Sequence, residues 1–371
     1  MAHGSARPTT RLSLGKRLAF TAVVVLVVYA AAEAVAWHVY ASNTPGPVRE
    51  AVSLIRRGGD PFRFAPRPYQ LYVPRPDYAA PGGDDRHNDL GFRGDATALP
   101  KPPGVFRIVC LGGSTTYSYR VNGVERTFPH QLETFLRAEA GAEGIEVVNA
   151  GCPGATSAEV LQTLAFRVPP LAPDLLIVHT GINDAILLER AGLRLDYGDA
   201  RQPAVLPRYG GLTRGLLASP LYRLTFVRTR LPRLMHAGVW DAAWAGARHL
   251  HRPTAYEANT VSTFLLGRGR GIPSVLVTER GRRAGPGAGR LWGEAMDRVR
   301  EAGLRAADRC GVPVCRFDRF PCTESDFVDL AHLRATAIER KAAWVGRDLL
   351  QFAVLPVGAG HGETPAGATG R

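Results

Sequence analysis

Three side chains in this chain could together catalyse acyl transfer through a serine. Ser114 follows two glycines in "CLGGSTT", and "DLAH" places Asp329 three residues before His332. A serine hydroxyl is a weak nucleophile until an adjacent imidazole accepts its proton. The imidazole in turn needs an acceptor for its second nitrogen, which fixes the tautomer and stabilises the imidazolium. We therefore expect Ser114 as the nucleophile, His332 as the general base and Asp329 as the partner of the histidine.

Acyl transfer also needs hydrogen-bond donors for the oxyanion of the tetrahedral intermediate. Each preorganised donor contributes about 3 to 4 kcal/mol to stabilising the transition state. The candidates are the backbone N–H groups of Ser114 and of Gly154 in "GCPGATS", and the side-chain amide of Asn183 in "GIND". Thr115 and Thr116 are expected to cap the segment that follows the serine.

Each of these motifs also has a structural interpretation when taken alone. A Gly-Gly-Ser after a strand is often a tight turn with a helix cap, and Gly154 suits an ordinary turn. Asn183 alone suits a helix cap, and an Asp-x-x-His alone suits a surface loop. Their order along the chain, each at the end of an expected strand or after the last one, favours the catalytic interpretation.

The surrounding sequence alternates buried strands with amphipathic helices. Apolar runs predict strands at 105–111, 145–150, 174–181, 272–278 and 312–318, and helical spacing predicts helices at 127–141, 156–168, 291–311 and 336–352. This alternation indicates a three-layer α/β/α sandwich with a central parallel sheet of about five strands. Ligands of such sheets bind beyond the carboxyl ends of the strands, where the candidate residues lie. His179, within the third strand, is expected to be buried and hydrogen-bonded.

Four motifs, in order, resemble the blocks of the SGNH hydrolase superfamily, also called GDSL-type esterases, over residues 104–353. The blocks are "CLGGSTT", "NAGCPGATS", "GIND" and "DLAH". The resemblance implies an α/β/α hydrolase with Ser114 as nucleophile, Gly154 and Asn183 as oxyanion donors, and Asp329 with His332. This chain has Gly-Gly-Ser where the family name denotes Gly-Asp-Ser. The segment "HNDLGFRGD" also resembles a segment that often precedes the first block in exported bacterial members of the family.

Two further departures from the family pattern follow the histidine. Where the family usually carries a hydroxyl residue and then a glycine, this chain has Arg334 and Ala337.

The N-terminal segment predicts a membrane anchor. A basic stretch, residues 1–17, precedes an apolar run at 18–40 that contains one acid, Glu33. As a helix with a rise of about 1.5 Å per residue, the run would span roughly 34 Å, enough for a bilayer core. The positive charges ahead of it predict a cytoplasmic N-terminus and an extracytoplasmic domain. The alternative is a cleaved signal peptide with a small-residue site at 30–32, which would secrete the domain and which the carboxylate of Glu33 favours.

The rest of the chain is expected to fall into three parts. Residues 41–103 are rich in proline and glycine, which predicts an extended lead-in without long helices. Residues 104–355 form the hydrolase-type domain, interrupted by an excursion at 185–253 that could be a lid, a substrate wall or a structural helical insertion. The tail, residues 356–371, is expected to be disordered.

Composition argues against several other classes of function. The formal net charge is +13, but only Lys16, Lys101 and Lys341 among the 46 basic residues are lysines, which suggests a codon bias rather than a nucleic-acid surface. A phosphate-binding Walker loop requires a lysine that is absent near Ser114. No zinc spacing and no dinucleotide fingerprint occurs, so neither a metal nor a cofactor is expected.

The five cysteines are expected to have two roles. Cys110 and Cys152 lie in apolar surroundings and are predicted to be buried. In an exported domain, two of Cys310, Cys315 and Cys322 could form a disulfide.

Three functions are compatible with these residues. The first is a serine esterase that removes acyl groups from an envelope carbohydrate or lipid, and acetyl is one candidate for the acyl group. The second is an O-acyltransferase that passes the acyl group of the same acyl-enzyme to a polysaccharide hydroxyl. The third is a non-catalytic envelope scaffold that retains the fold.

Overall fold

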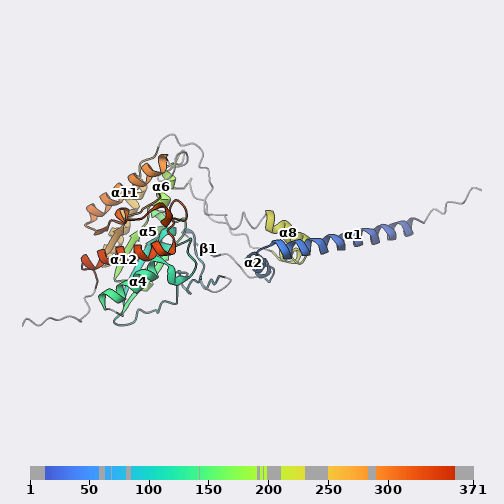
Figure 1. Ribbon diagram of the computed structural model, residues 1–371, viewed down its shortest axis with the longest axis horizontal. Coiled ribbons are helices and arrows are strands. Elements are labelled where there is room, and N and C mark those ends of the chain that lie inside the picture. The colour runs from blue at the N-terminus through green and yellow to red at the C-terminus, as the bar shows by residue number, and fades with distance from the viewer. Residues whose placement is uncertain are drawn as a thin grey trace, which may run out of the picture. The chain divides into compact units, whose positions relative to one another are not determined.

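The chain forms two compact units in a computed structural model (Figure 1). The model describes residues 13–57, 63–67, 69–80, 85–141, 143–189, 193–194, 196–198, 210–229, 250–282 and 290–355. One unit combines residues 1–61 with 207–236, and the other combines residues 62–206 with 237–371. The two units are described separately below.

A five-stranded parallel sheet forms the centre of the second unit, and this confirms the predicted fold class. Its strands are β3 (Phe106–Gly112), β4 (Ile145–Gly151), β5 (Leu175–His179), β6 (Ser274–Val277) and β7 (Val314–Cys315). The spatial order is β4-β3-β5-β6-β7, and all four pairings are parallel. β3 is continuously apolar from Ile108 to Leu111, and β5 from Leu175 to Val178, because both faces of these strands are covered.

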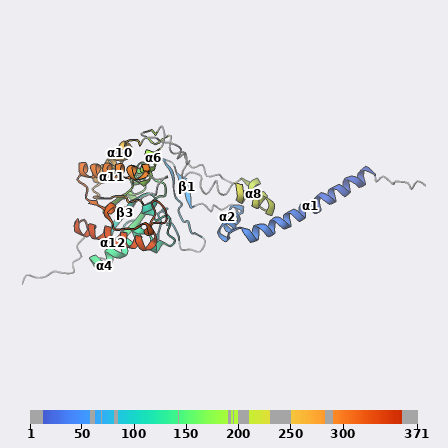
Figure 2. The ribbon, with the colours of Figure 1, turned by 45° about the horizontal axis from the view of Figure 1, so that its top comes forward.

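Helices cover both faces of the sheet (Figure 2). One face packs against α4 (Phe128–Ala140) and α12 (Ala335–Gln351), and the other packs against α5 (Ser157–Phe166), α10 (Thr254–Gly269) and α11 (Arg290–Cys310). Side chains along β3 alternate between the two cores. Ile108 and Cys110 enter the first core, and Val109 and Leu111 enter the second.

The predicted helices α4, α5, α11 and α12 agree with the structure to within two residues at each end. α5 begins with a complete capping box between Thr156 and Glu159, as its sequence indicates. The fifth expected strand is shorter than predicted, because β7 ends at Cys315 and a 3-10 turn, η3 (Phe317–Arg319), follows. The helices α6 (Ile182–Leu188) and α10 were not predicted.

The lead-in contains more regular structure than its prolines suggest. α2 (Gly46–Arg56) is a helix of 11 residues, so the prediction of no long helix here was wrong. Pro45 and Pro47 stand at its start, where a missing backbone N–H breaks no helical hydrogen bond. Further along, β1 (Phe64–Arg67) and β2 (Gln70–Pro74) form an antiparallel hairpin in the second unit.

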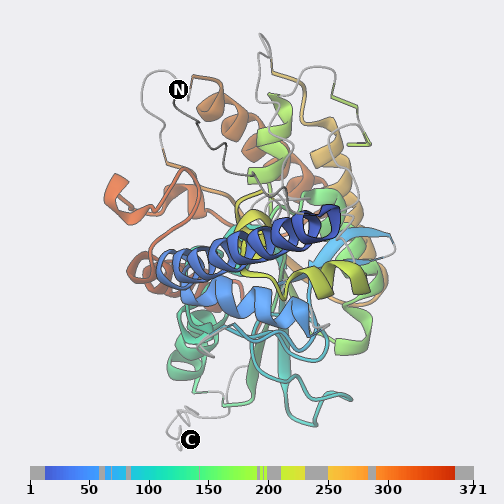
Figure 3. The same cartoon turned by 90° about the vertical axis from the view of Figure 1, so that its right-hand side faces the viewer.

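The described residues of the first unit form four helices: α1 (Leu14–Asn43), α2, α7 (Gly211–Leu216) and α8 (Pro220–Thr229). α8 lies against α1 (Figure 3), and Leu217 and Phe226 pack with Val52 and Ile55 of α2. α1 has the length and apolar composition to cross a membrane. The described helices of the 185–253 excursion therefore belong to the unit that contains the apolar N-terminal helix.

Leu188 and His251, which lie near the two ends of the excursion, are hydrogen-bonded to each other. The backbone N–H of His251 donates to the carbonyl of Leu188, the last residue of α6, over 3.0 Å. α6 itself carries Asn183. The Trp240 and Trp244 region of the excursion, and the tail at 356–371, lie outside the described residues.

None of the five cysteines, all of which lie in the described part of the chain, forms a disulfide. Cys110 and Cys152 are buried, as predicted. The disulfide that two of Cys310, Cys315 and Cys322 could have formed is not present among these described residues. Cys315 is instead a core residue on β7, and Cys310 ends α11 in the other core.

Candidate active site

Ser114 is the second residue after strand β3, which ends at Gly112, and it begins the four-residue helix α3 (Ser114–Tyr117). The two preceding glycines are required by close packing. A Cβ on Gly112 would lie 2.0 Å from the carbonyl oxygen of His179, and one on Gly113 would lie 2.8 Å from Nδ2 of Asn183. Glycine therefore lets the nucleophile segment approach β5 and the loop that follows it.

His332 forms a hydrogen-bonded pair with Asp329 on the loop before α12. Nδ1 of His332 lies 2.8 Å from both oxygens of Asp329, whose Oδ1 also accepts the backbone N–H groups of Ala331 and His332. Burial favours a higher pKa for Asp329, but these hydrogen bonds outweigh burial and hold the pKa well below its usual range. Asp329 is therefore an ionised acceptor that fixes Nδ1 as the protonated nitrogen.

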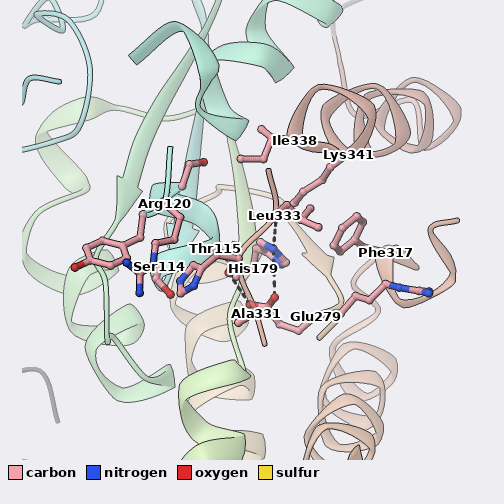
Figure 4. A pocket seen from close by; sticks show the side chains of 14 residues that line it. Ser114, Thr115, Arg120, His179, Glu279, Phe317, Ala331, Leu333, Ile338 and Lys341 are labelled. Atoms are coloured by element: carbon pink, nitrogen blue, oxygen red, sulfur yellow. Dashed lines mark hydrogen bonds and ion pairs between the residues drawn. The ribbon is translucent and has the colours of Figure 1, made fainter. Parts of the chain in front are cut away.

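His332 shares a small pocket with Ser114 (Figure 4). Its Nε2 is buried and has no hydrogen-bond partner among the described residues. The nitrogen opposite the carboxylate is thus free to accept a proton in the pocket that Ser114 lines. Arg334 and Ala337, the two departures from the family pattern, lie after this loop: Arg334 precedes α12, and Ala337 is buried in its first turn.

The expected oxyanion donors converge beside Ser114. Gly154 lies in the turn after β4, in which the N–H of Ala155 donates to the carbonyl of Cys152. The Asn183 amide donates one N–H to the carbonyl of Ala155 over 2.7 Å. An asparagine amide has two N–H donors, and the described residues show an acceptor for one of them. Asn183 therefore links the Gly154 turn to the nucleophile segment.

Asp184, next to Asn183, holds these loops together. It is fully buried and accepts hydrogen bonds from the backbone N–H and hydroxyl of Ser157 and from the hydroxyl of Tyr197. Burial raises the pKa of Asp184 to about 6, although the hydrogen bonds partly offset this effect. The contact with Ser157 fastens the start of α5 immediately after the Gly154 turn.

Sequence reasoning missed four charged residues that line the pocket: Arg120, Arg280, Glu279 and Lys341. Of these, Glu279 and Lys341 are buried. Glu279 comes directly after the apolar segment 272–278, so the position at a strand end was a usable signal. Lys341 contacts His179, which is buried and hydrogen-bonded as predicted.

Thr115 and Thr116 do not cap a following segment. Thr115 Oγ1 donates to Glu279 over 3.0 Å, and Thr116 Oγ1 donates to the carbonyl of His179 over 3.0 Å. Both hydroxyls therefore tie helix α3 to the sheet, which corrects the expectation from the sequence.

The "HNDLGFRGD" segment supports the nucleophile segment through Arg93. This arginine is buried and donates to the carbonyls of Tyr117, Ser118 and Val121 over 2.7 to 2.8 Å. Asp85 accepts from its Nε over 2.7 Å. The lead-in thus fixes the backbone directly after the nucleophile helix.

The comparisons with known proteins agree with this architecture. The profile of the GDSL-like lipase/acylhydrolase family matches residues 110–337. No curated protein matches the sequence.

Solved structures similar to this chain share low sequence identity with it. A lipase/acylhydrolase from Enterococcus faecalis is 16% identical with a TM-score of 0.43, and the match covers 67% of this chain and 97% of that one. Axe2, an acetylxylan esterase from Geobacillus stearothermophilus, is 16% identical with a TM-score of 0.41 and coverages of 66% and 94%. TesA is 17% identical with a TM-score of 0.42 and coverages of 67% and 99%. Because the family profile spans more than half of its length, the chain belongs to the GDSL-like lipase/acylhydrolase family.

Proposed function

We propose that this protein is a serine esterase in which Ser114, His332 and Asp329 form the catalytic triad. The observation that carries the proposal is the pocket in which Ser114 and the unpartnered Nε2 of His332 meet, with Asp329 held on Nδ1. Gly154, Asn183 and the N–H of Ser114 supply the oxyanion donors. This arrangement contains each group that ester hydrolysis requires.

The reaction follows from the positions of these groups. Ser114 Oγ attacks the ester carbonyl while Nε2 of His332 takes its proton, and the oxyanion donors stabilise the negative charge on the carbonyl oxygen. The tetrahedral intermediate collapses when His332 returns the proton to the leaving alcohol, which leaves an acyl-serine. Water then attacks the acyl-serine, again with His332 as the base, and releases the carboxylic acid. Asp329 stabilises the imidazolium in both steps.

We infer that α1 anchors the enzyme in a membrane and that its substrates are acyl esters, acetyl among them, of envelope carbohydrates or lipids. Residues 14–32 of α1 are exposed throughout. The apolar run at 18–40 lies within α1, and at about 1.5 Å per residue it is about 34 Å long, enough to cross a bilayer core of roughly 30 Å. The positive charges before it favour an extracytoplasmic enzyme.

Glu33 supports retention of the anchor over cleavage. It accepts hydrogen bonds from the hydroxyls of Tyr29 and Ser219 over 2.5 Å each, and from the backbone N–H of Leu221 over 3.1 Å. A carboxylate at the start of α8 is stabilised by the helix dipole. The acid thus has partners at the end of the exposed stretch. Mass spectrometry of the membrane-bound protein tests this proposal, because a chain that begins after residue 32 would contradict it.

The catalytic proposal is tested with the full-length protein in detergent. Hydrolysis of p-nitrophenyl acetate and labelling by a fluorophosphonate probe should both be lost in Ser114→Ala, and hydrolysis should be lost in His332→Ala. Ser118→Ala is the matched control, because Ser118 lines the same pocket and its hydroxyl accepts only a backbone N–H, from Phe128. Activity that survives both triad substitutions would refute the assignment.

The same assay separates the two other candidate functions. Transfer of the acetyl group to an added sugar acceptor, detected as an acetylated product, would identify an O-acyltransferase. A wild-type protein that neither hydrolyses the ester nor reacts with the probe would indicate a scaffold.

A further inference from the structure

We propose that Glu279 and Lys341, with His179, form a buried network that sets the position of Ser114 relative to His332. They are positioning residues, because they act on the reaction through the segments that carry the triad. The inference rests on the proposed esterase function and adds to it the groups that align its two catalytic segments.

One half of the network holds the nucleophile segment. Thr115, adjacent to Ser114, donates its hydroxyl to Oε1 of Glu279 over 3.0 Å. Thr116 donates to the carbonyl of His179 over 3.0 Å. Helix α3 has only four residues and cannot be rigid by itself. These two hydrogen bonds fix it to the ends of strands β6 and β5.

The other half holds the helix that follows the histidine. Lys341 lies on α12, which begins three residues after His332, and its Nζ is 2.7 Å from Nε2 of His179. Nδ1 of His179 lies 3.1 Å from the carbonyl of Val277, so Nδ1 carries the proton and Nε2 accepts from the ammonium. His179 therefore links α12 to the sheet beside the nucleophile segment.

The two halves meet in the pocket (Figure 4). Oε2 of Glu279 is 3.4 Å from Nε2 of His179, the atom to which Lys341 donates. This oxygen has no hydrogen-bond partner among the described residues, although the side chain is only 5% exposed. The cavity there is about 10 Å³, room for about one water molecule. The network thus lies directly behind the space that Ser114 and His332 share.

The energetic cost of this network points to a role beyond packing. Lys341 is 2% exposed and lies over the rings of Phe128 and Phe317, with Nζ 4.3 and 5.0 Å from their centroids. Glu279 and Lys341 interact through their opposite charges and not through a direct ion-pair contact, and apolar residues of similar volume often replace buried opposite charges without loss of stability. Such residues could not hold the hydroxyl of Thr115 and the ring of His179 at once.

The pKa values of Glu279 and Lys341 are both shifted by their surroundings. Burial raises the pKa of Glu279 to about 7 and lowers that of Lys341 to about 8, while each charge partly offsets the shift of the other. Glu279 also faces His179 on β5 and Asp184 on α6. The other neighbours of Lys341 are the thiols of Cys110 on β3 and Cys315 on β7. We therefore expect Glu279→Gln to alter the pH profile of kcat/KM between about pH 6 and 8.

The test compares single variants with a double variant that removes both charges. In full-length protein, Glu279→Leu and Lys341→Met should each lower kcat for p-nitrophenyl acetate at least ten-fold, with KM within two-fold, and should lower the melting temperature. The double variant leaves no unpaired charge, so its melting temperature should recover. Its kcat should stay low. Recovery of kcat together with stability would overturn the proposal, because the pair would then be only structural.

Arg107→Met is the matched control. Arg107 is a buried cation on β3, the strand that leads to Ser114, but it lies at the opposite end and pairs with Glu146. Its loss should lower the melting temperature and leave kcat unchanged at temperatures where the protein is folded. An equal loss of kcat in this variant would also overturn the proposal.

Crystal structures of the wild type and the double variant provide a measurement that needs no activity. The separation between Ser114 Oγ and His332 Nε2 should change in the double variant, and an unchanged separation would refute the positioning role. If the separation changes as expected but the wild-type protein has no esterase activity, the proposed esterase function is refuted and the positioning role is not.

Discussion

His332 Nδ1 lies 2.8 Å from each carboxylate oxygen of Asp329, and the same carboxylate accepts the backbone N–H groups of Ala331 and His332. The aspartate therefore fixes both the ring and the backbone of the loop. Because these bonds hold the pKa of Asp329 well below its usual range, the carboxylate stays ionised throughout the pH range in which an imidazole can act as a base.

Asp329→Asn should lower kcat for p-nitrophenyl acetate by about 10³ to 10⁴-fold. An asparagine amide presents an N–H to Nδ1 and favours the tautomer whose Nε2 carries the proton, so the ring cannot accept the serine proton. Asp326→Asn is the control, because Asp326 lies on the same loop but pairs with Arg340 and Thr323. A similar loss of kcat in both variants would show that the loop, and not the triad, is sensitive to the lost charge.

Asn183→Ala should lower kcat by about 10² to 10³-fold, the usual effect of removing one oxyanion donor. We assign the second N–H of the amide to the intermediate, so the loss should fall on kcat more than on KM. Asn259→Ala is the matched control, because its amide donates to the hydroxyl of Ser157 in the adjacent helix. If Asn183→Ala hydrolysed the ester at the wild-type rate, the amide would have no part in the oxyanion hole.

Glu33→Leu should release the 210–229 segment from α1. The carboxylate accepts the hydroxyl of Ser219 and the N–H of Leu221, and these two hydrogen bonds hold the segment against α1. In detergent, trypsin should cut this segment, which contains Arg214, about ten-fold faster than in the wild type. Asn43→Ala on the same helix should leave the cleavage rate unchanged. Equal rates in Glu33→Leu and the wild type would contradict the role assigned to this acid.

His87→Gln should cost most stability at neutral pH and less as the solution becomes acidic. Burial lowers the pKa of His87 to about 3, with Arg63 and Arg93 adding to the shift. Below the unfolded pKa of about 6.5, the unfolded chain therefore binds a proton that the folded protein excludes. The stability that His87 contributes is thus lost as the pH falls.

Denaturant unfolding measures this effect. The gap in unfolding free energy between the wild type and His87→Gln should shrink by about 1.4 kcal/mol per pH unit from about pH 6 to about 4. If the gap for His87→Gln stayed constant as the pH fell, the histidine would bind a proton as readily in the folded state as in the unfolded chain.

The sheet and most of the helices could be predicted because their signals are local. The runs at β3, β4 and β5 are apolar on both faces, and α12 repeats apolar residues at helical spacing. α10 was missed because its threonines, asparagine and glycines are weak helix formers, and packing between α5 and α11 stabilises it instead.

The missed residues of the site differ in how far the sequence could have indicated them. Glu279 follows an apolar strand, and Lys341 stands at helical spacing among Ile338, Ala342 and Val345, on the face that enters the core. Both positions could therefore have been suspected. The contacts of Arg93 with carbonyls 24 to 28 residues away, and those of Glu33 with Ser219, depend on tertiary packing and leave no local pattern.

Arg93 makes the hydrolase dependent on residues ahead of its family-defining region. The match to the family begins at residue 110, yet the guanidinium that holds the carbonyls of Tyr117, Ser118 and Val121 is contributed from upstream. Loss of the segment between α1 and residue 104 would leave Ser114, Asp329 and His332 in the product. It would nevertheless leave three carbonyls beside Ser114 without the guanidinium that donates to them. The region defined by the family match is therefore incomplete without Arg93, and a cut that removes this arginine would disturb the backbone beside Ser114 without touching any of these three side chains.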